Sequence, residues 1–436
     1  MTTRVLLLEA GGPESGAIVQ TAVRSGYQVH AATTSAIHTT YGAELKALLS
    51  GCLLTDFDRP DQTLRDIVAY VRNQDINAVF TTNEYLTELL AHVCADLGLP
   101  GNDPALAAAA RDKAAMYGAF TDAGVTTPYS RLVSSEDELR ALCAAGSIAF
   151  PCVIKPVDGA GSAGVTVLTN SAQVPAAWRV VHAPHGMYRT SSDAQVLVQE
   201  YVVGTEYSIE SITQRSITTH LCITEKAVTS GAHRVETGHS LPAALPPIVE
   251  QNVHREVEKA IAAVGIRNGA SHTEVIVGTD GRCTVIEIGA RMGAGQIGFL
   301  IQHALGIDPW AACLDTAIGR AADLTPTSNG YATVRFLTSP RHGRIAAMTG
   351  LPERGPRVPI VRLRAETGQV VYGAERNATR LGSFVVVGPN RDTVSPYADH
   401  LLAQIRIEVE PVEPTDSHAT SRESDSASSS SHVDHR

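Results

Sequence analysis

A glycine-rich loop between two strand-forming segments limits how this chain can fold. The loop spans residues 159–164 with the sequence GAGSAG, and it lies between the apolar runs 152–155 and 165–168. A dinucleotide-binding loop with the same glycine spacing needs a strand before it and a helix after it. Because β-forming residues stand on both sides here, we expect the loop to join two antiparallel strands. Such a loop can close over phosphates through its backbone N–H groups, and an ordinary long hairpin is the alternative.

The first 110 residues show a different pattern, in which strands and helices alternate. Strands are predicted at 4–9, 28–32, 52–55 and 76–82, with helices from about Glu14 and over 85–97. This alternation is typical of an open parallel sheet. The second strand ends without the acidic residue that holds a ribose hydroxyl in dinucleotide folds, so NAD is not expected here. No lysine follows a glycine, which excludes a Walker A loop.

Two acidic residues are predicted to face one another on neighbouring strands. Glu274 lies in the run 272–277 and Glu287 in the run 284–288, with a Gly-Thr-Asp-Gly turn between them. Antiparallel pairing across this turn would place both carboxylates on one face of the hairpin. Like charges in that position need a cation, and hard oxygen ligands suit Mg²⁺. The pair is therefore a candidate metal site, with Arg291 close by; a salt-bridged hairpin end is the alternative.

Charge and composition exclude several classes of protein. With 44% hydrophobic residues the chain can form several folded domains, and its net charge of −10 argues against nucleic acid as a partner. No apolar run reaches the length of a membrane span, and the first run stops at Glu9, too early for a signal peptide. We therefore expect a cytoplasmic protein with no membrane partner. Seven cysteines include no CxxC pair, so a zinc motif of that type is not expected.

Several motifs and their order along the chain resemble those of the ATP-grasp superfamily of carboxylate–amine ligases over roughly residues 1–400. The resemblance rests on Asp112-Lys113, Val153-Ile154-Lys155-Pro156, the glycine loop, the run from Gln199 to Glu206, and the set Glu274, Glu287 and Arg291. The segment Val235-Glu236-Thr237-Gly238-His239 is similar to one in the bacterial L-amino acid (dipeptide) ligases.

The resemblance implies an α/β protein with the ATP-grasp fold. It divides the chain into a Rossmann-like, open parallel-sheet domain (1–110), a small subdomain with the glycine lid (111–194), a large subdomain with the metal site (195–324), and a small β-rich C-terminal subdomain (325–412). The tail 413–436 is rich in Ser, Asp and His and is expected to be disordered.

The resemblance also implies which residues bind ATP. Lys113 and Lys155 would hold the phosphates beneath the lid residues Gly161 and Ser162, and Lys226 is a weaker third candidate. Only five lysines occur among 35 basic residues, which agrees with a need for compact charges at these positions. Glu206 would accept hydrogen bonds from the ribose, and the adenine edge would meet the hinge residues Glu200, Tyr201, Val202 and Val203.

The remaining implied roles concern the metal and the substrates. Glu274 and Glu287 would hold one or two Mg²⁺ ions, with Mn²⁺ as an alternative. Arg291 and His239 would stabilise the transferring phosphoryl group and bind substrate. Glu84, just after a strand at the carboxyl edge of the first sheet, would bind a substrate ammonium, although an acid at a helix start is also stabilised by the dipole. Glu236 would face an ammonium or a metal.

The activity implied is that of an ADP-forming ligase which depends on ATP and Mg²⁺. It would convert an amino acid carboxylate to an acyl phosphate and couple it to an amine of a second amino acid. Alternatives are another acceptor (a carrier-protein thiol, an amino sugar or a purine intermediate) and a catalytically silent nucleotide-binding module. The expected partners are these small molecules, and a homodimer is an open possibility because such relatives are often dimers.

One position departs from the superfamily pattern. An asparagine commonly stands two residues after the second metal glutamate, and here that position is Gly289. A second metal ion would then have fewer side-chain ligands, so the number of metal ions stays open.

Overall fold

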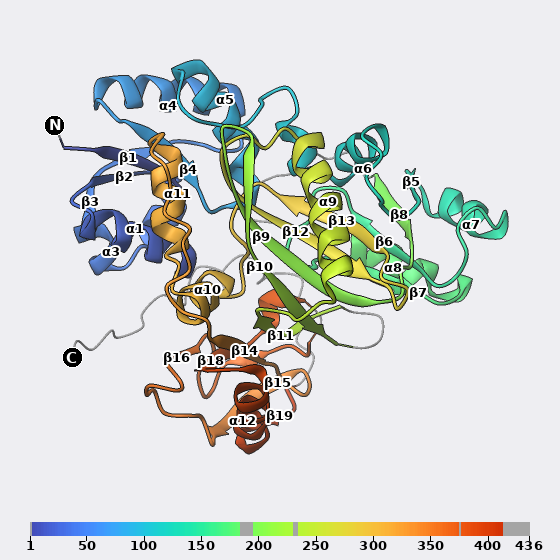
Figure 1. Cartoon of the computed structure of the whole chain (residues 1–436). Coiled ribbons are helices and arrows are strands. Elements are labelled where there is room, and N and C mark those ends of the chain that lie inside the picture. The colour runs from blue at the N-terminus through green and yellow to red at the C-terminus, as the bar shows by residue number, and fades with distance from the viewer. Residues whose placement is uncertain (1, 184–194, 230–233, 375, 413–436) are drawn as a thin grey trace.

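In the computed structural model, the described residues are 2–183, 195–229, 234–374 and 376–412. They form four β-sheets with helices packed against them (Figure 1). The predicted disordered tail, 413–436, lies outside the described residues.

The N-terminal sheet is parallel, as the alternating pattern predicts. Its order is β3-β2-β1-β4, formed by β1 (Arg4–Leu8), β2 (Gln28–Thr33), β3 (Leu49–Leu54) and β4 (Ala78–Thr81). The central strand β1 buries Val5 to Leu8 completely because helices cover both faces of such a sheet. The helices of this part are α1 (Pro13–Arg24), α2 (Ser35–Thr40), α3 (Ala43–Leu48), α4 (Pro60–Asn73), η1 (Glu84–Leu86) and α5 (Thr87–Leu97).

The glycine loop joins two antiparallel strands, as predicted. β6 (Cys152–Pro156) pairs with β7 (Thr166–Leu168), with Cys152 opposite Leu168. The four-stranded sheet has the order β5-β8-β6-β7, completed by β5 (Ser130–Val133) and β8 (Val196–Glu200). The helices around this sheet are η2 (Ala107–Ala110), α6 (Lys113–Asp122), α7 (Glu136–Ala144), η3 (Ser171–Gln173) and α8 (Val174–Val181).

An eight-stranded sheet runs through the middle of the chain and into its C-terminal part. Its order is β13-β12-β9-β10-β11-β14-β18-β16. β11 (Glu236–Leu241) pairs with β14 (Tyr331–Leu337), so the sheet is continuous across the predicted boundary at 324/325. The other strands are β9 (Thr205–Gln214), β10 (Ile217–Val228), β12 (Gly269–Val277), β13 (Cys283–Gly289), β16 (Ile360–Leu363) and β18 (Gly382–Gly388).

The C-terminal part adds a second, smaller sheet. Its order is β17-β15-β19, formed by β15 (Gly343–Thr349), β17 (Val370–Val371) and β19 (Arg406–Glu410). The remaining helices are α10 (Ile297–Leu305), α11 (Pro309–Ala317), η4 (Asn377–Thr379) and α12 (Arg391–Gln404). Among the described residues, no single helix is long and apolar enough to cross a membrane; α10 and α11 pass that test only as a pair, and they meet at a bend of 108°.

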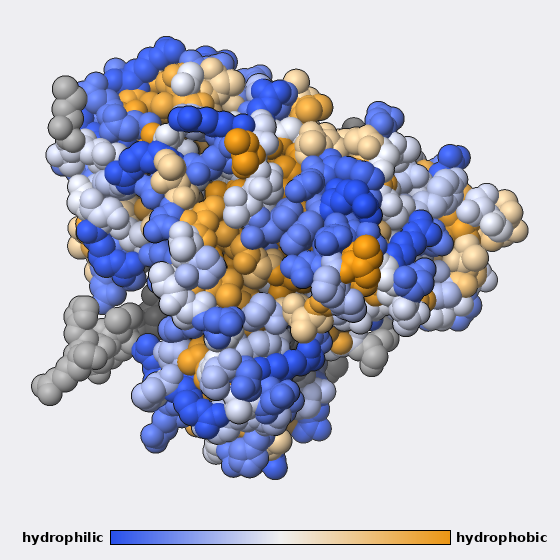
Figure 2. Space-filling model, viewed as in Figure 1, coloured by the Kyte–Doolittle hydropathy of each residue, from blue (hydrophilic) through white to orange (hydrophobic). Residues whose placement is uncertain are grey.

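Helix α9 (Pro247–Ala263) lies against the eight-stranded sheet through an apolar face. Val253 and Val257 are fully buried, whereas Glu250 and Arg255 are exposed, and Figure 2 shows a mostly hydrophilic surface over this helix. A histidine pair adds to this contact: His254 of α9 stacks on His220 of β10 with ring centroids 4.3 Å apart. Burial lowers the pKa of His220 to about 4.

This buried histidine predicts a loss of stability in mild acid. The unfolded chain takes up a proton on His220 near its ordinary pKa of 6.5, whereas the folded chain does so only near 4. His220 should therefore contribute a fall in the free energy of unfolding as the pH drops below 6.5, of about 2 kcal/mol between pH 7 and 5. Denaturant unfolding followed by circular dichroism at both pH values would measure this loss.

The variant His220→Gln should lose less stability than the wild type over this range, and His92→Gln, at an exposed histidine, should match the wild type. Equal losses in all three proteins would contradict the assignment.

Candidate active site

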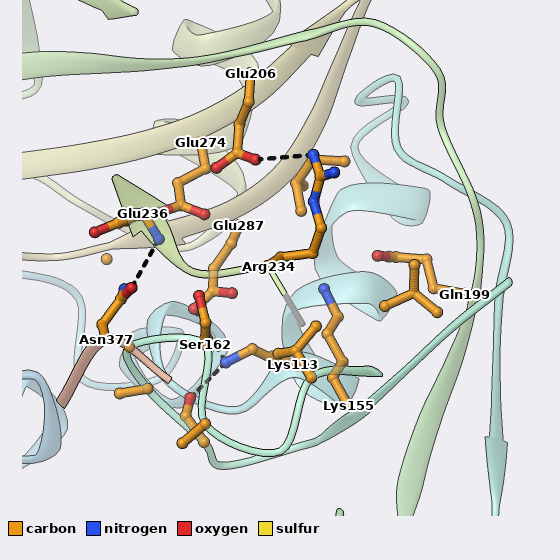
Figure 3. Close-up of a pocket in the computed structure, with 18 of the residues that line it drawn as sticks. Lys113, Lys155, Ser162, Gln199, Glu206, Arg234, Glu236, Glu274, Glu287 and Asn377 are labelled. Carbon is orange, nitrogen blue, oxygen red and sulfur yellow. Dashed lines mark hydrogen bonds and ion pairs between the residues drawn. The ribbon is translucent and has the colours of Figure 1, made fainter. Parts of the chain in front are cut away.

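A cavity of about 230 Å³, partly open to solvent, lies between the glycine loop and the eight-stranded sheet (Figure 3). Its lining includes all but two of the site residues named from the sequence: Glu84, Lys113, Lys155, Gly161, Ser162, Glu200, Tyr201, Val202, Glu206, Glu236, His239, Glu274, Glu287 and Arg291. Segments up to about 200 residues apart in sequence therefore meet at one place.

One exception is the weaker candidate Lys226, described below, and the other is Val203. It is not among the lining residues, and 77% of it is exposed. Successive residues of an extended segment point to opposite sides, and Val202 faces the cavity here. The Val203 side chain therefore faces solvent, and only a backbone contact of Val203 with the adenine stays a prediction.

Two lysines meet beside the glycine loop. Asp112 caps α6 by accepting hydrogen bonds from the N–H groups of residues 114 and 115, which places Lys113 at the first position of the helix. The Lys113 ammonium donates to the Gly159 carbonyl at 2.6 Å, and Lys155 projects into the cavity from β6. Burial lowers the pKa of Lys155 to about 8, although Glu287 acts in the opposite direction. Two ammonium groups beside a loop rich in backbone N–H groups suit an anion such as a phosphate.

The two predicted metal ligands face each other as the turn between them suggested. Glu274 of β12 and Glu287 of β13 are direct partners in the antiparallel register. Each carboxylate is neutralised by a lysine: Lys226 lies 2.5 Å from Glu274, and Lys113 lies 3.0 Å from Glu287.

These residues fit a divalent cation that arrives with a nucleotide. Both carboxylates line the cavity and offer hard oxygen ligands. Within the described ranges, no group of three or more His, Cys, Asp or Glu side chains is placed to hold a metal ion. Phosphate oxygens and water would therefore have to complete the coordination, as is common for Mg²⁺.

Lys226, only a weak candidate from the sequence, lies among three acids. Its ammonium contacts Glu206 at 2.9 Å, Glu236 at 3.1 Å and Glu274 at 2.5 Å, and its side chain is 2% exposed. Burial alone would lower its pKa, but the three carboxylates raise it well above its ordinary value. Lys226 does not itself line the cavity; it is a fixed positive charge buried behind the three acids that do.

His272 also lines the cavity and was not predicted. Its Nδ1 lies 2.6 Å from the fully buried Glu210, and its Nε2 lies 3.2 Å from Glu274. Although burial acts to lower its pKa, Glu210 raises it to about 9, so the ring is positively charged at neutral pH. The sequence signal was its position two residues before Glu274 in a strand, which puts both side chains on one face.

Glu84 and Arg291 form an ion pair within the cavity. Glu84 begins η1 three residues after Thr81, the last residue of β4, at the carboxyl edge of the parallel sheet, where it was expected. This pair also explains the departure at Gly289, because a β-carbon there would lie 3.1 and 3.2 Å from the two Glu84 oxygens. The Glu84 carboxylate therefore occupies the space into which an asparagine at 289 would extend.

His239 lies on β11 beside Glu236, with Nε2 3.3 Å from a Glu236 oxygen. Burial lowers the pKa of His239 to about 4, so the imidazole is neutral at pH 7. The family resemblance implied that His239, like Arg291, stabilises the transferring phosphoryl group. A neutral ring cannot do this through a positive charge. It can accept or donate a proton, and neither ring nitrogen has a hydrogen-bond partner among the described residues.

The close approach of Glu84 to Gly289 predicts that the two positions are energetically coupled. Gly289→Asn should displace Glu84 from Arg291 and destabilise the protein by about 1–3 kcal/mol. In a Glu84→Ala background the same substitution should be much less destabilising, because the space is then empty. A double-mutant cycle of denaturant midpoints would measure the coupling, and additive effects would show that the two side chains do not compete for space.

Comparisons with known proteins agree with this geometry. Three family models match the chain: the ATP-grasp N-terminal domain over residues 19–101, the ATP-grasp domain over 148–299, and L-amino acid ligase C-terminal domain 2 over 335–410.

Individual relatives point the same way. The chain is 26% identical to an uncharacterised protein of Sinorhizobium fredii over 342 residues, which is 77% of this chain and 69% of that protein. It is 27% identical to the alanine–anticapsin ligase of Bacillus subtilis over 291 residues, 62% of this chain and 60% of the ligase. The match thus spans less than two thirds of that ligase.

Among solved structures, the L-amino acid ligase from Bacillus licheniformis shares the fold. The TM-score is 0.77 at 18% identity, and the alignment covers 94% of this chain and 99% of that one. These matches identify the chain as an ATP-grasp protein that resembles the L-amino acid ligases.

Proposed function

We propose that the protein is an ATP- and Mg²⁺-dependent, ADP-forming ligase that joins the carboxylate of one amino acid to the amine of another through an acyl phosphate. One observation carries the proposal: a single cavity holds two lysines beside a glycine loop, a facing pair of carboxylates, and a separate group of charged residues beyond them. The lysines beside the glycine loop suit phosphate groups, the facing carboxylates suit a metal ion, and the further charged residues suit a zwitterionic substrate.

The nucleotide would occupy the side of the cavity next to the glycine loop. Lys113 and Lys155 would hold its phosphates, the backbone from Glu200 to Val202 would meet the adenine, and Glu206 would accept hydrogen bonds from the ribose hydroxyls. Glu274 and Glu287 would hold Mg²⁺, which offsets the negative charge of the phosphate oxygens when it is bound.

Arg291 lies where charge develops when the γ-phosphoryl group moves to a carboxylate oxygen. Its guanidinium is held in place by Glu84, so it needs no rearrangement to stabilise that charge. The donor amino acid would place its carboxylate near Arg291 and its ammonium near Glu84.

The amine of the acceptor must lose a proton as it attacks. The nitrogen bonds to the acyl carbon, the bond from that carbon to the phosphate oxygen breaks, and inorganic phosphate leaves. The His239 imidazole can take the proton, because its lowered pKa leaves the ring unprotonated at neutral pH and neither ring nitrogen has a hydrogen-bond partner in the described residues. We assign His239 this role in place of charge stabilisation.

The test is to measure ADP and phosphate release with Mg·ATP across a matrix of amino acid pairs, with mass spectrometry of the products. We expect release that depends on the pair, together with a product whose mass is that of the two amino acids minus one water. Glu287→Gln should lower the rate by about 100-fold or more.

Glu250→Gln serves as the matched control, because it removes the same charge from an exposed position on α9. It should leave the rate unchanged. Release of AMP and pyrophosphate, or the absence of any coupled product across the matrix, would contradict the proposal.

A further inference from the structure

The C-terminal part of the chain contributes two polar residues to the cavity, Asn377 of η4 and Arg380 just after it. In Figure 3, Asn377 and Glu236 lie on one side of Glu287 and Gln199 lies on the other. Asn377 accepts a hydrogen bond from the Glu236 backbone N–H at 3.0 Å, which joins this segment to β11. The C-terminal part therefore forms the part of the cavity wall next to Glu236.

Arg380 is buried and held by three contacts. Its Nε donates to the Asn377 carbonyl at 2.9 Å, its Nη1 donates to Glu236 at 3.1 Å, and its guanidinium lies over the Phe336 ring at 3.9 Å. Only 9% of the residue is exposed, yet it lines the cavity. Across the described ranges, no partner is found for Nη2. The planar group is thus fixed in orientation and keeps a donor for a further acceptor.

The three arginines that line the cavity in the described part of the chain differ in how their charge is balanced. Arg291 has Glu84 as its own partner, and Glu84 raises its pKa despite burial. Arg234 lies 4.0 Å from Glu206 on the nucleotide side and is more exposed.

Arg380 shares its partner, because Glu236 also contacts Lys226 at 3.1 Å. Burial lowers the pKa of Arg380 below its ordinary value, which the shared Glu236 does not fully offset. Arg234 and Arg380 therefore both share a carboxylate with Lys226, and Arg380 is the more buried of these two cavity arginines.

The surroundings of Arg380 fit a small zwitterion. One Glu236 oxygen lies 3.1 Å from the Arg380 guanidinium and 3.3 Å from His239 Nε2, so an anion site, a carboxylate and a neutral base lie within a few ångströms. An α-amino acid carries its ammonium and carboxylate on the same carbon, which matches this short separation.

We propose that Arg380 binds the free carboxylate of the acceptor amino acid, so that the acceptor must be an amino acid with an unmodified carboxylate. The inference rests on the ligase activity proposed above. Arg380 takes part in no bond that forms or breaks: it places the acceptor so that the amine nitrogen faces the acyl carbon and the proton it loses faces His239.

The first test uses the wild-type enzyme and needs no variant. With one fixed donor, the free acid and the carboxamide of the same acceptor are compared by product formation. The free acid should have a kcat/KM at least about 10-fold higher, because the carboxamide carries no charge for Arg380 to bind. Equal values would overturn the proposal while leaving the ligase activity intact, whereas absence of product with every acceptor would overturn the ligase activity itself.

The second test uses Arg380→Met and Arg380→Lys. Arg380→Met should raise the KM for the free-acid acceptor about 10- to 100-fold, leave the KM values for ATP and donor unchanged, and remove the preference for acid over carboxamide. Arg380→Lys should restore part of the preference, because it keeps the charge without the planar fork. Arg376→Met, an exposed arginine four residues earlier, is the matched control and should behave as wild type.

A rise in the KM for the donor, with the acid preference retained, would instead assign Arg380 to the other substrate and overturn the proposal. Circular dichroism of each variant identifies any that fail to fold, and in that case the wild-type comparison decides.

Discussion

Lys226 places a buried ammonium group between the carboxylates of Glu206, Glu236 and Glu274, which come from β9, β11 and β12. Without it, three like charges would face one another in a site of low polarity, and the acids would separate or take up protons. With it, the three carboxylates share one counter-charge, and, despite burial, the ammonium group lowers the pKa values of Glu236 and Glu274. We infer that this one side chain fixes the relative positions of the ribose, substrate and metal ends of the proposed site. A ligand bound at one end would therefore affect the other two.

Two other acids of the cavity also have protein cations as partners. Glu287 is paired with Lys113 and Glu84 with Arg291. In the proposed reaction, phosphate oxygens would compete for Lys113 and a metal ion would compete for Glu287, so ligands would exchange existing ion pairs and would not bring isolated charges together. Such a site changes little in polarity as the nucleotide binds, which is the condition for stabilising a transition state with groups already in place.

Local patterns in the sequence were enough to predict the parts of the site that lie close together in the chain. The parallel sheet of residues 1–110 follows from its alternating strands and helices, and the facing of Glu274 and Glu287 follows from a short turn and the two-residue period of strands. The central place of Lys226 and the presence of Arg380 could not be predicted, because they depend on how β10, β11 and β14 associate across about 100 residues of sequence. No local pattern fixes the pairing of these strands. The pairing of β11 with β14 also extends the eight-stranded sheet past the expected domain boundary at 324/325.

The central claim, activation of a carboxylate as an acyl phosphate in this cavity, is tested most directly by isotope transfer. The donor amino acid is labelled with ¹⁸O in both carboxylate oxygens, and the released inorganic phosphate is analysed by mass spectrometry. Our account predicts one ¹⁸O atom in each phosphate, since the oxygen that joined carbon to phosphorus leaves with the phosphate. Unlabelled phosphate accompanying product formation would contradict it.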